Sequence, residues 1–219
     1  MATWIVHLRI ADKLIEKYGI NQKREFIIGS VSPDCGYGVK DSFGEFTPPP
    51  EVTHWAPGGV KKHCRCRDFS GEYLTGKQKN SDYYFYLAYY VHLLTDIMWS
   101  SMIYLPTRIK YADEYKKNPH YLKTIKQDWY DLDFRFLSKT PDFSAYKILK
   151  GCREVKDYLP YYEENQLSSQ VRYISDFYSD CSSRNIERDY PFLTEDDVNE
   201  FINSALEIIG YDLKRKNLI

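Results

Sequence analysis

Apolar positions recur at helical spacing from the start of the chain. The intervals alternate between three and four residues, which places these side chains on one face of a helix. The stripe consists of Trp4, His7, Ala11, Leu14 and Tyr18. Thr3 can cap this helix, and Gly19 stands where a left-handed residue commonly ends one. The pattern predicts an N-terminal helix that turns His7 toward the core.

A second strong helical pattern runs from about Ser81 to Ile103, and we expect it to stop before Pro106. No segment of comparable length alternates between apolar and polar residues as a strand would. Shorter helical patterns fill 24–29, 107–117, 119–138, 143–158, 165–180 and 195–209. The sequence therefore predicts an all-α fold with one domain over residues 1–219 and no internal repeat.

Residues 35–80 interrupt this helical pattern. The segment contains Pro48-Pro49-Pro50 and Pro57-Gly58-Gly59 and has few periodic apolar positions. An irregular stretch of this length inside a compact domain is usually functional or mobile. We expect a long irregular loop that crosses the mouth of a site.

Composition narrows the class of protein. The chain has 219 residues, 43% of them hydrophobic and 28% charged, with a net charge of -1. This balance lacks the basic footprint of a nucleic-acid-binding domain, so no stable nucleic-acid partner is expected. There is no run of about 18 apolar residues that would span a membrane, and the first residues do not resemble a secretory signal. These features favour a cytoplasmic protein.

Five cysteines are spaced unevenly along the chain. An odd number without an export signal is typical of reduced thiols. Cys64-Arg65-Cys66 beside His63 is an alternative metal knuckle, but no second ligand pair follows at zinc-finger spacing.

Candidate chemistry begins on the helix predicted near residue 92. His92 and Asp96 are four residues apart, so both face the same way, and Asp82 and Tyr89 extend this polar line at intervals of seven. The neighbours of His92 are apolar, so the polar groups on this face need partners. A metal ion is one such partner, since imidazole and carboxylate are good zinc ligands. The alternative is that the two side chains pair with each other or with backbone.

Three further residues join this pair as candidate ligands. His7 lies on an apolar stripe, Asp34 follows Ser32-Pro33, and His54 precedes Trp55. Each has a simpler explanation: a hydrogen-bonded core histidine, a turn residue and an ordinary loop histidine. Taken together, the five residues His7, Asp34, His54, His92 and Asp96 favour a divalent metal site, most naturally for zinc.

Four short motifs carry these residues in a particular order. They are His-Leu-x-Ile-Ala at 7–11, Pro-Asp-x-Gly at 33–36, Thr-His-Trp at 53–55 and His-Leu-Leu-Thr-Asp-x-x-Trp at 92–99. This order resembles the zinc-dependent phospholipase C family, which is related to the P1-type nucleases. The likeness is greatest to short bacterial members without secretion signals. It covers residues 4–99 by motif and the remainder by helical character.

The resemblance implies a helical domain whose core holds one to three zinc ions. By motif, His7 is the first-helix ligand, Asp34 and His54 are loop ligands, and His92 and Asp96 form the central-helix pair. Asp96 would bridge two ions, and Asp34 and Asp96 are the candidate catalytic residues. Two nearby cations can clamp a phosphodiester and activate water. The implied activity is hydrolysis of a phosphoric ester, whether lipid, nucleotide or small metabolite.

The chain also departs from this family. Its relatives use a mature N-terminal tryptophan as a ligand, whereas Trp4 lies three residues before His7. They carry a later His-x-x-x-Glu motif, but here Thr124 stands four residues after His120. Asp133 is a possible additional ligand or a partner of a ligating histidine, and Asp82 is a second such candidate.

Other charged residues of the helical segments have a simpler interpretation. For Asp128 and Asp131, exposure to solvent is at least as well supported by the sequence as metal binding. His63 and His120 are expected on the surface.

The leading hypothesis is therefore a metal-dependent hydrolase of phosphoric esters. The main alternative is a non-catalytic, metal-stabilised helical module that binds a protein or ligand, and a third possibility is a helical domain without metal.

Overall fold

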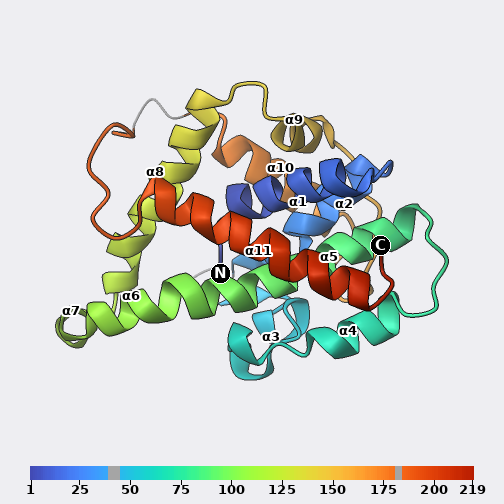
Figure 1. Ribbon diagram of the computed structural model, residues 1–219, viewed down its shortest axis with the longest axis horizontal. Helices are drawn as coiled ribbons and strands as arrows, with labels where there is room; N and C mark the ends of the chain where they lie inside the picture. Colours follow the sequence, from blue (N-terminus) through green and yellow to red (C-terminus); the bar gives the residue numbers. More distant parts are fainter. Residues whose placement is uncertain (39–44, 181–183) are drawn as a thin grey trace.

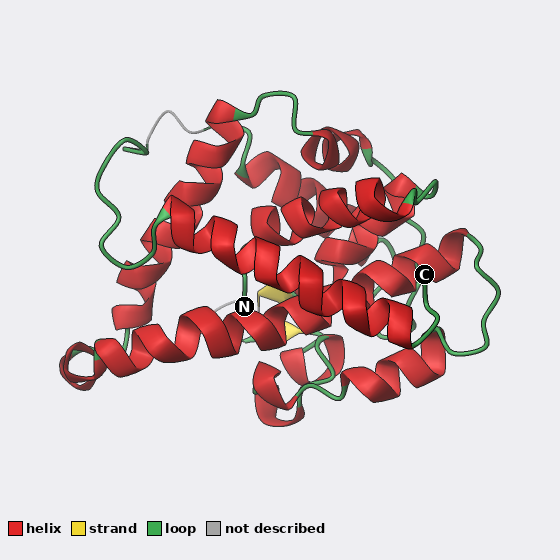
Figure 2. Ribbon diagram, viewed as in Figure 1, coloured by secondary structure: helices red, strands yellow, loops and turns green. Residues whose placement is uncertain are grey.

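The computed structural model describes residues 1–38, 45–180 and 184–219. These residues form eleven α-helices and one two-stranded antiparallel sheet of β1 (Tyr37–Gly38) and β2 (Phe46–Thr47), as Figure 2 shows. The predicted all-α class is confirmed. Within the described ranges, no helix is long and apolar enough to cross a membrane.

The N-terminal helix α1 (Trp4–Tyr18) has the predicted limits. It ends at Gly19, whose φ of 62° lies in the left-handed region. Thr3 stands at the N-cap, but its hydroxyl donates to Asp133 instead of capping the helix. His7 is buried in the core, as predicted.

Two segments close together in the sequence form the next part of the core. Helix α2 (Lys23–Val31) leads directly into a 3-10 turn at Ser32–Asp34. Helix α5 (Ser81–Trp99) packs along α2, α4 and α11 and is buried over most of its length. Gly29 permits this contact, because a Cβ on Gly29 would collide with the carbonyl oxygen of Phe85.

The predicted stop before Pro106 is wrong. A π-helical turn (Ser100–Tyr104) follows α5 and leads into α6 (Leu105–Lys110), so the helical rod continues past Pro106, as Figure 1 shows. Pro106 lies in the first turn of α6, directly after the π turn, so its missing N–H falls where the regular helical hydrogen-bond pattern is already interrupted. The π turn is the local irregularity that lets the rod pass the proline ring.

The remaining helices surround this core. Helix α11 carries a capping box, because Thr194 and Asp197 satisfy each other's backbone N–H groups. It packs on α1 and α5, while α9 packs on α1, α2 and α10. Helix α9 ends seven residues before the limit predicted from sequence. The bounds are α7 (Ala112–Lys117), α8 (Tyr121–Lys139), α9 (Ser144–Gly151), α10 (Gln166–Phe177) and α11 (Glu195–Arg215).

The region predicted as an irregular loop over residues 35–80 is more ordered than expected. It contains α3 (Pro50–Thr53) and α4 (Cys66–Tyr73), together with the small sheet. Phe69 holds α4 in place, because its buried ring stacks on Tyr89 of α5 and meets the edge of Trp55. The apolar stripe of α4, Cys66, Phe69 and Tyr73, has helical spacing but spans only eight residues of a polar segment, which is why the sequence pattern did not reveal α4. Residues 39–44 of this segment lie outside the described residues.

The thiols agree with the expectation of reduced cysteines in the described part of the chain. Cys35, Cys64, Cys66 and Cys152 are free, and Cys181 lies outside the described residues.

Candidate metal centre

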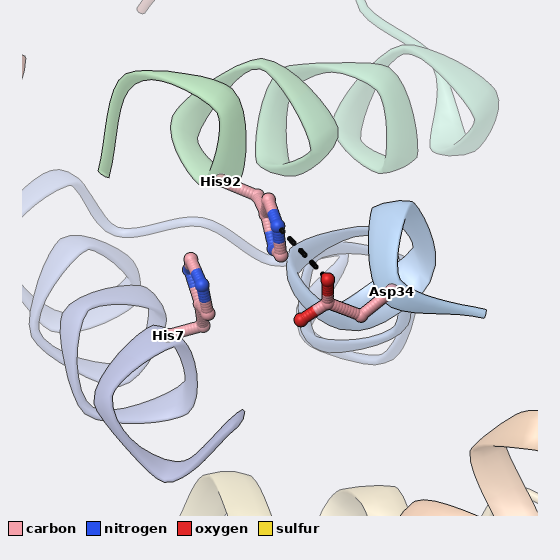
Figure 3. Close-up of side chains that lie close together, drawn as sticks. All are labelled: His7, Asp34 and His92. Atoms are coloured by element: carbon pink, nitrogen blue, oxygen red, sulfur yellow. Dashed lines mark ion pairs between the residues drawn. The ribbon is translucent and has the colours of Figure 1, made fainter. Parts of the chain in front are cut away.

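Five predicted ligands meet at one buried point in the structure. Figure 3 shows three of them: the rings of His7 from α1 and His92 from α5 face each other beside the carboxylate of Asp34. His54, directly after α3, and Asp96, one turn beyond His92, complete the group. The Nε2 atom of His54 lies 3.1 Å from Oδ1 of Asp34. Four separate chain segments therefore bring metal-ligand atoms together.

Four of these atoms have the spacing of a tetrahedral site: Nε2 of His54 and His92, Oδ1 of Asp34 and Oδ2 of Asp96. Five of their six pairwise separations are 3.1, 3.4, 3.6, 3.7 and 3.9 Å. Ligand atoms around a tetrahedral zinc with bonds of ~2.0–2.2 Å lie about 3.3–3.6 Å apart. The observed separations bracket this range, so small side-chain movements would suffice to bind an ion.

The ring of His92 is held in the orientation that a metal ligand needs. Its Nδ1 lies 2.8 Å from the backbone carbonyl oxygen of Ser30. Since a carbonyl only accepts, Nδ1 carries the proton and Nε2 presents its lone pair to the centre. Gly29, which lets α2 approach α5, therefore also places the carbonyl that fixes this tautomer.

His54 has conflicting contacts without a metal. Its Nδ1 lies 2.9 Å from Oγ1 of Thr53. Its Nε2 lies 3.1 Å from a carboxylate oxygen of Asp34, which needs a proton between them, and 2.6 Å from Nζ of Lys61, which needs a lone pair. One nitrogen cannot meet both needs, whereas a cation between Nε2 and Asp34 would remove the conflict.

His7 extends the centre to a second position. Its ring stacks on His92 with centroids 3.7 Å apart, and its Nε2 lies 3.6 Å from Oδ1 of Asp96. That separation exceeds hydrogen-bond distance, and both ring nitrogens of His7 are buried without a hydrogen-bond partner, as is Oδ2 of Asp34. Buried polar atoms are nearly always satisfied. These unpaired atoms fit a metal-binding role.

The described residues contain two groups that bring three ligand atoms within 4.8 Å of one another. One is His7, Asp34 and His92, and the other is His54, His92 and Asp96. Neither group includes Cys64 or Cys66, so the alternative knuckle gains no support from the described structure.

Lys61 was not among the predicted site residues. Its Nζ lies 2.6 Å from Oδ2 of Asp96 and 3.6 Å from Oδ1 of Asp34, in addition to its contact with His54. The ammonium thus partly neutralises the two carboxylates. A lysine in a polar segment after Gly58-Gly59 is exposed by default, so nothing in the pattern of hydrophobic residues indicated this position.

Burial and the neighbouring charges at the centre shift the pKa values of its residues. Burial would raise the pKa values of Asp34 and Asp96, but the ammonium of Lys61, with smaller contributions from contacts with neighbouring groups, outweighs burial and lowers both. Burial also lowers the pKa of His54, as does Lys61, and burial lowers the pKa of His92 well below its usual value. The favoured state is therefore two carboxylates facing neutral His54 and His92, which is the state that binds a metal.

Asp133 is buried, as predicted, but its partners belong to the scaffold. Its two oxygens accept hydrogen bonds from Thr3 and Tyr178 at 2.7 and 2.6 Å. Burial raises the pKa of Asp133 to about 7. Thr3 is next to Ala2, whose backbone N–H donates to Asp96 at 2.9 Å. Asp133 therefore supports the chain that flanks the centre and contacts none of the five candidate ligands.

Asp82 does not belong to the centre. It lies in the first turn of α5 and pairs with Lys156 at 2.5 Å. Fourteen residues separate it from Asp96, which corresponds to about 21 Å along a helix. Asp82 and Asp96 do lie on one face of α5, as their spacing in multiples of seven suggested, but at opposite ends of that face.

The other acidic residues singled out on α8 are held by arginines. Asp128 and Asp131 are buried, and Arg188 reaches both at 2.7 and 2.8 Å. Their expected exposure is wrong, because the segment after residue 184 folds back over them. His63 and His120 are exposed, as expected.

A cavity of about 750 Å³ opens beside the centre. Asp34, His54 and Lys61 form part of its wall, and residues of α8 and α10 form another part. The segment 35–80 thus does border the mouth of the centre, as expected. The cavity gives a ligand of moderate size access to the candidate metal ligands.

Comparison with known proteins adds no relative: no protein-family model, curated protein or solved structure matches the chain.

Proposed function

We propose that this protein is a metal-dependent hydrolase of phosphoric esters whose centre binds zinc through His7, Asp34, His54, His92 and Asp96. The single observation that carries the proposal is the near-tetrahedral spacing of four ligand atoms from three chain segments, with five of their six separations between 3.1 and 3.9 Å, beside an open cavity. The motif resemblance to the zinc-dependent phospholipase C family points to the same ligands and the same reaction.

The protein residues have distinct parts in this proposal. Bound zinc supplies Lewis acidity toward a phosphoryl oxygen and the attacking water. Asp34 lines the cavity, and its Oδ2 has no partner, so it is placed to accept a proton from that water. Asp96 offers Oδ2 to the tetrahedral position and Oδ1 toward His7, an arrangement suited to bridging two ions.

Lys61 supplies the observation that favours the non-catalytic alternatives. Its ammonium already offsets the charges of Asp34 and Asp96, so the cluster is compensated without metal. A metal must displace Nζ from Oδ2 of Asp96. Lys61 lines the cavity, which gives its flexible side chain somewhere to move.

Hydrolysis of bis(4-nitrophenyl) phosphate tests the proposal. We expect zinc-stimulated release of nitrophenol by the wild-type protein and a loss of at least about 100-fold in His92→Ala, because a ligand of the metal is removed. His63→Ala is the matched control, since His63 is exposed and belongs to neither group of candidate ligands. Zinc-loaded protein that hydrolyses neither this diester nor 4-nitrophenyl phosphate contradicts the proposal.

Lys61→Met separates catalysis from the alternatives. If Lys61 competes with metal, the substitution should tighten zinc binding, measured by competition with a chelating dye. If the protein uses lysine in place of metal, the substitution leaves two buried carboxylates uncompensated and should lower stability without creating a zinc site.

A further inference from the structure

Lys126 is a cation beside the centre that has no partner among the described residues. It lies on α8, lines the cavity, and is half-buried. It forms no hydrogen bond or ion pair with any residue in the described part of the chain. Exposed lysines elsewhere do find carboxylates: Lys156 pairs with Asp82, and Lys139 pairs with Glu195.

The surroundings of Lys126 disfavour its charge. Burial lowers its pKa, and the ammonium of Lys61 lowers it further, while Asp34 and Asp96 act in the opposite direction. Those two carboxylates are already shared with Lys61 and the histidines. A cation in this position is stabilised by an anionic ligand that enters the cavity.

Among the described residues of the cavity wall, the charged side chains are Lys61, Lys123, Lys126 and Asp34. Lys61 is paired with Asp34 and Asp96, whereas Lys126 has no carboxylate partner among the described residues. If metal occupies the carboxylates, the positive excess increases. A substrate that carries a cationic headgroup would place that group beside lysines, whereas a substrate with two negative charges matches the wall.

We propose that Lys126 binds the second negative charge of the substrate, so that the centre selects phosphomonoester dianions over diesters. This inference rests on the proposed hydrolase function and deepens it. Aromatic side chains add to the specificity, because Trp4, Tyr130 and Tyr173 line the same cavity and offer apolar surface to the alcohol portion. The substrate class is therefore a phosphomonoester of an aromatic or otherwise apolar alcohol.

Binding of a phosphonate that cannot be hydrolysed tests this directly. Phenylphosphonate, titrated calorimetrically into zinc-loaded protein at a pH where it is a dianion, should bind wild type. It should bind Lys126→Gln about tenfold or more weakly, because a charge-assisted hydrogen bond is lost. The monomethyl ester of the same acid carries one charge and should lose less than about threefold in the same variant.

Two further variants control the charge and the location. Lys126→Arg keeps the positive charge and should restore binding of phenylphosphonate to within about threefold of wild type. Lys116→Gln removes an exposed lysine that pairs with Asp113 away from the cavity, and its affinity should equal that of wild type.

Three results overturn the inference: wild type that does not bind phenylphosphonate, Lys126→Gln that binds it as tightly as wild type, or equal losses for the dianion and its methyl ester. If Lys126→Gln does not fold, NMR of the wild-type protein provides the test, because the Nζ resonance of Lys126 should shift when phenylphosphonate binds. A resonance that does not shift also overturns the inference. Binding is measured without turnover, so normal phosphonate binding without ester hydrolysis contradicts the hydrolase proposal alone.

Discussion

Two groups of buried carboxylates in this protein have very different partners. On α8, Asp128 and Asp131 are enclosed by Arg188 and Arg184, and Asp128 also accepts the backbone N–H of Phe192 at 2.8 Å. At the candidate metal centre, Asp34 and Asp96 share one lysine and face three histidines. There one carboxylate oxygen and both nitrogens of His7 are left without a hydrogen-bond partner.

The difference separates a structural ion cluster from a candidate reactive one. Arginine forks match carboxylates in geometry and charge, so the α8 group needs nothing more. The centre has good ligand spacing but incomplete hydrogen bonding, and it borders an open cavity. Unpaired buried groups cost free energy, and those at the centre are imidazole and carboxylate atoms, which a bound cation would satisfy.

The largest expected effect comes from breaking the centre. Asp96→Ala should lower the free energy of unfolding by about 3–5 kcal/mol, because Lys61 loses a buried counter-charge. Asp131→Ala should lower it by about 1 kcal/mol, since its arginine partners are part-exposed and can return to water. Urea unfolding of both variants checks the order. A larger loss in Asp131→Ala would reverse the comparison.

Removing the charge of Arg188 from the α8 cluster should have an intermediate effect on stability. Arg188→Gln leaves Asp128 buried with a single backbone donor, so we expect a loss of about 2–3 kcal/mol. Zinc content should stay at the wild-type value, because Arg188 touches none of the candidate ligands. Loss of zinc together with stability would show that the two clusters are not independent.

Acidification should weaken the fold in the presence of a chelator. The pKa values of His54 and His92 are lowered in the fold, so their contribution is complete above the unfolded value of about 6.5 and is lost as the pH falls. Asp133 has the opposite effect on stability. Its pKa is raised to about 7, so between pH 6 and 5 the folded protein binds a proton at Asp133 that the unfolded chain does not bind.

Because two histidines oppose one carboxyl, the unfolding free energy should fall as the pH is lowered from 6 to 5, by on the order of 1 kcal/mol. Urea unfolding across this range measures the slope. Stability that is flat or increases on acidification would show that His54 and His92 are not held neutral.

The smallest expected effect isolates Asp133. Asp133→Asn removes the opposing proton uptake and keeps a side chain that can bond to Thr3 and Tyr178. The fall in unfolding free energy between pH 6 and 5 should become steeper by about 1 kcal/mol per pH unit, while stability near pH 8 should equal or exceed that of wild type. An unchanged slope would mean that Asp133 is ionised throughout this range in the fold.

Much of the fold followed from hydrophobic periodicity. Helices α1, α2, α5, α8, α10 and α11 lie close to their predicted ranges because each buries a continuous stripe or a whole surface. The pattern failed where a few tertiary contacts decide the structure. Helix α4 depends on Phe69, and the rod through Pro106 depends on a π turn that has no sequence signature.

The five candidate ligands could be predicted from the sequence, but Lys61, which compensates the charge of their carboxylates, could not. His7, His92 and Asp96 were placed by helical spacing, and Asp34 and His54 entered through their motifs. Lys61 could not be found this way, because a long flexible side chain can reach a buried acid from almost any loop position. The arginines over Asp128 and Asp131 were missed for the same reason, since they come from irregular chain more than 50 residues away.

The central claim, that the five-residue cluster is a metal centre, is tested most directly by zinc content together with chelator sensitivity. Elemental analysis of freshly purified protein should find at least one equivalent of zinc, and a chelator at neutral pH should lower the melting temperature by several degrees or more, because binding to the native state stabilises it. Readdition of zinc should restore the melting temperature. Protein without stoichiometric metal, with the same melting temperature in chelator and in zinc, would contradict the account.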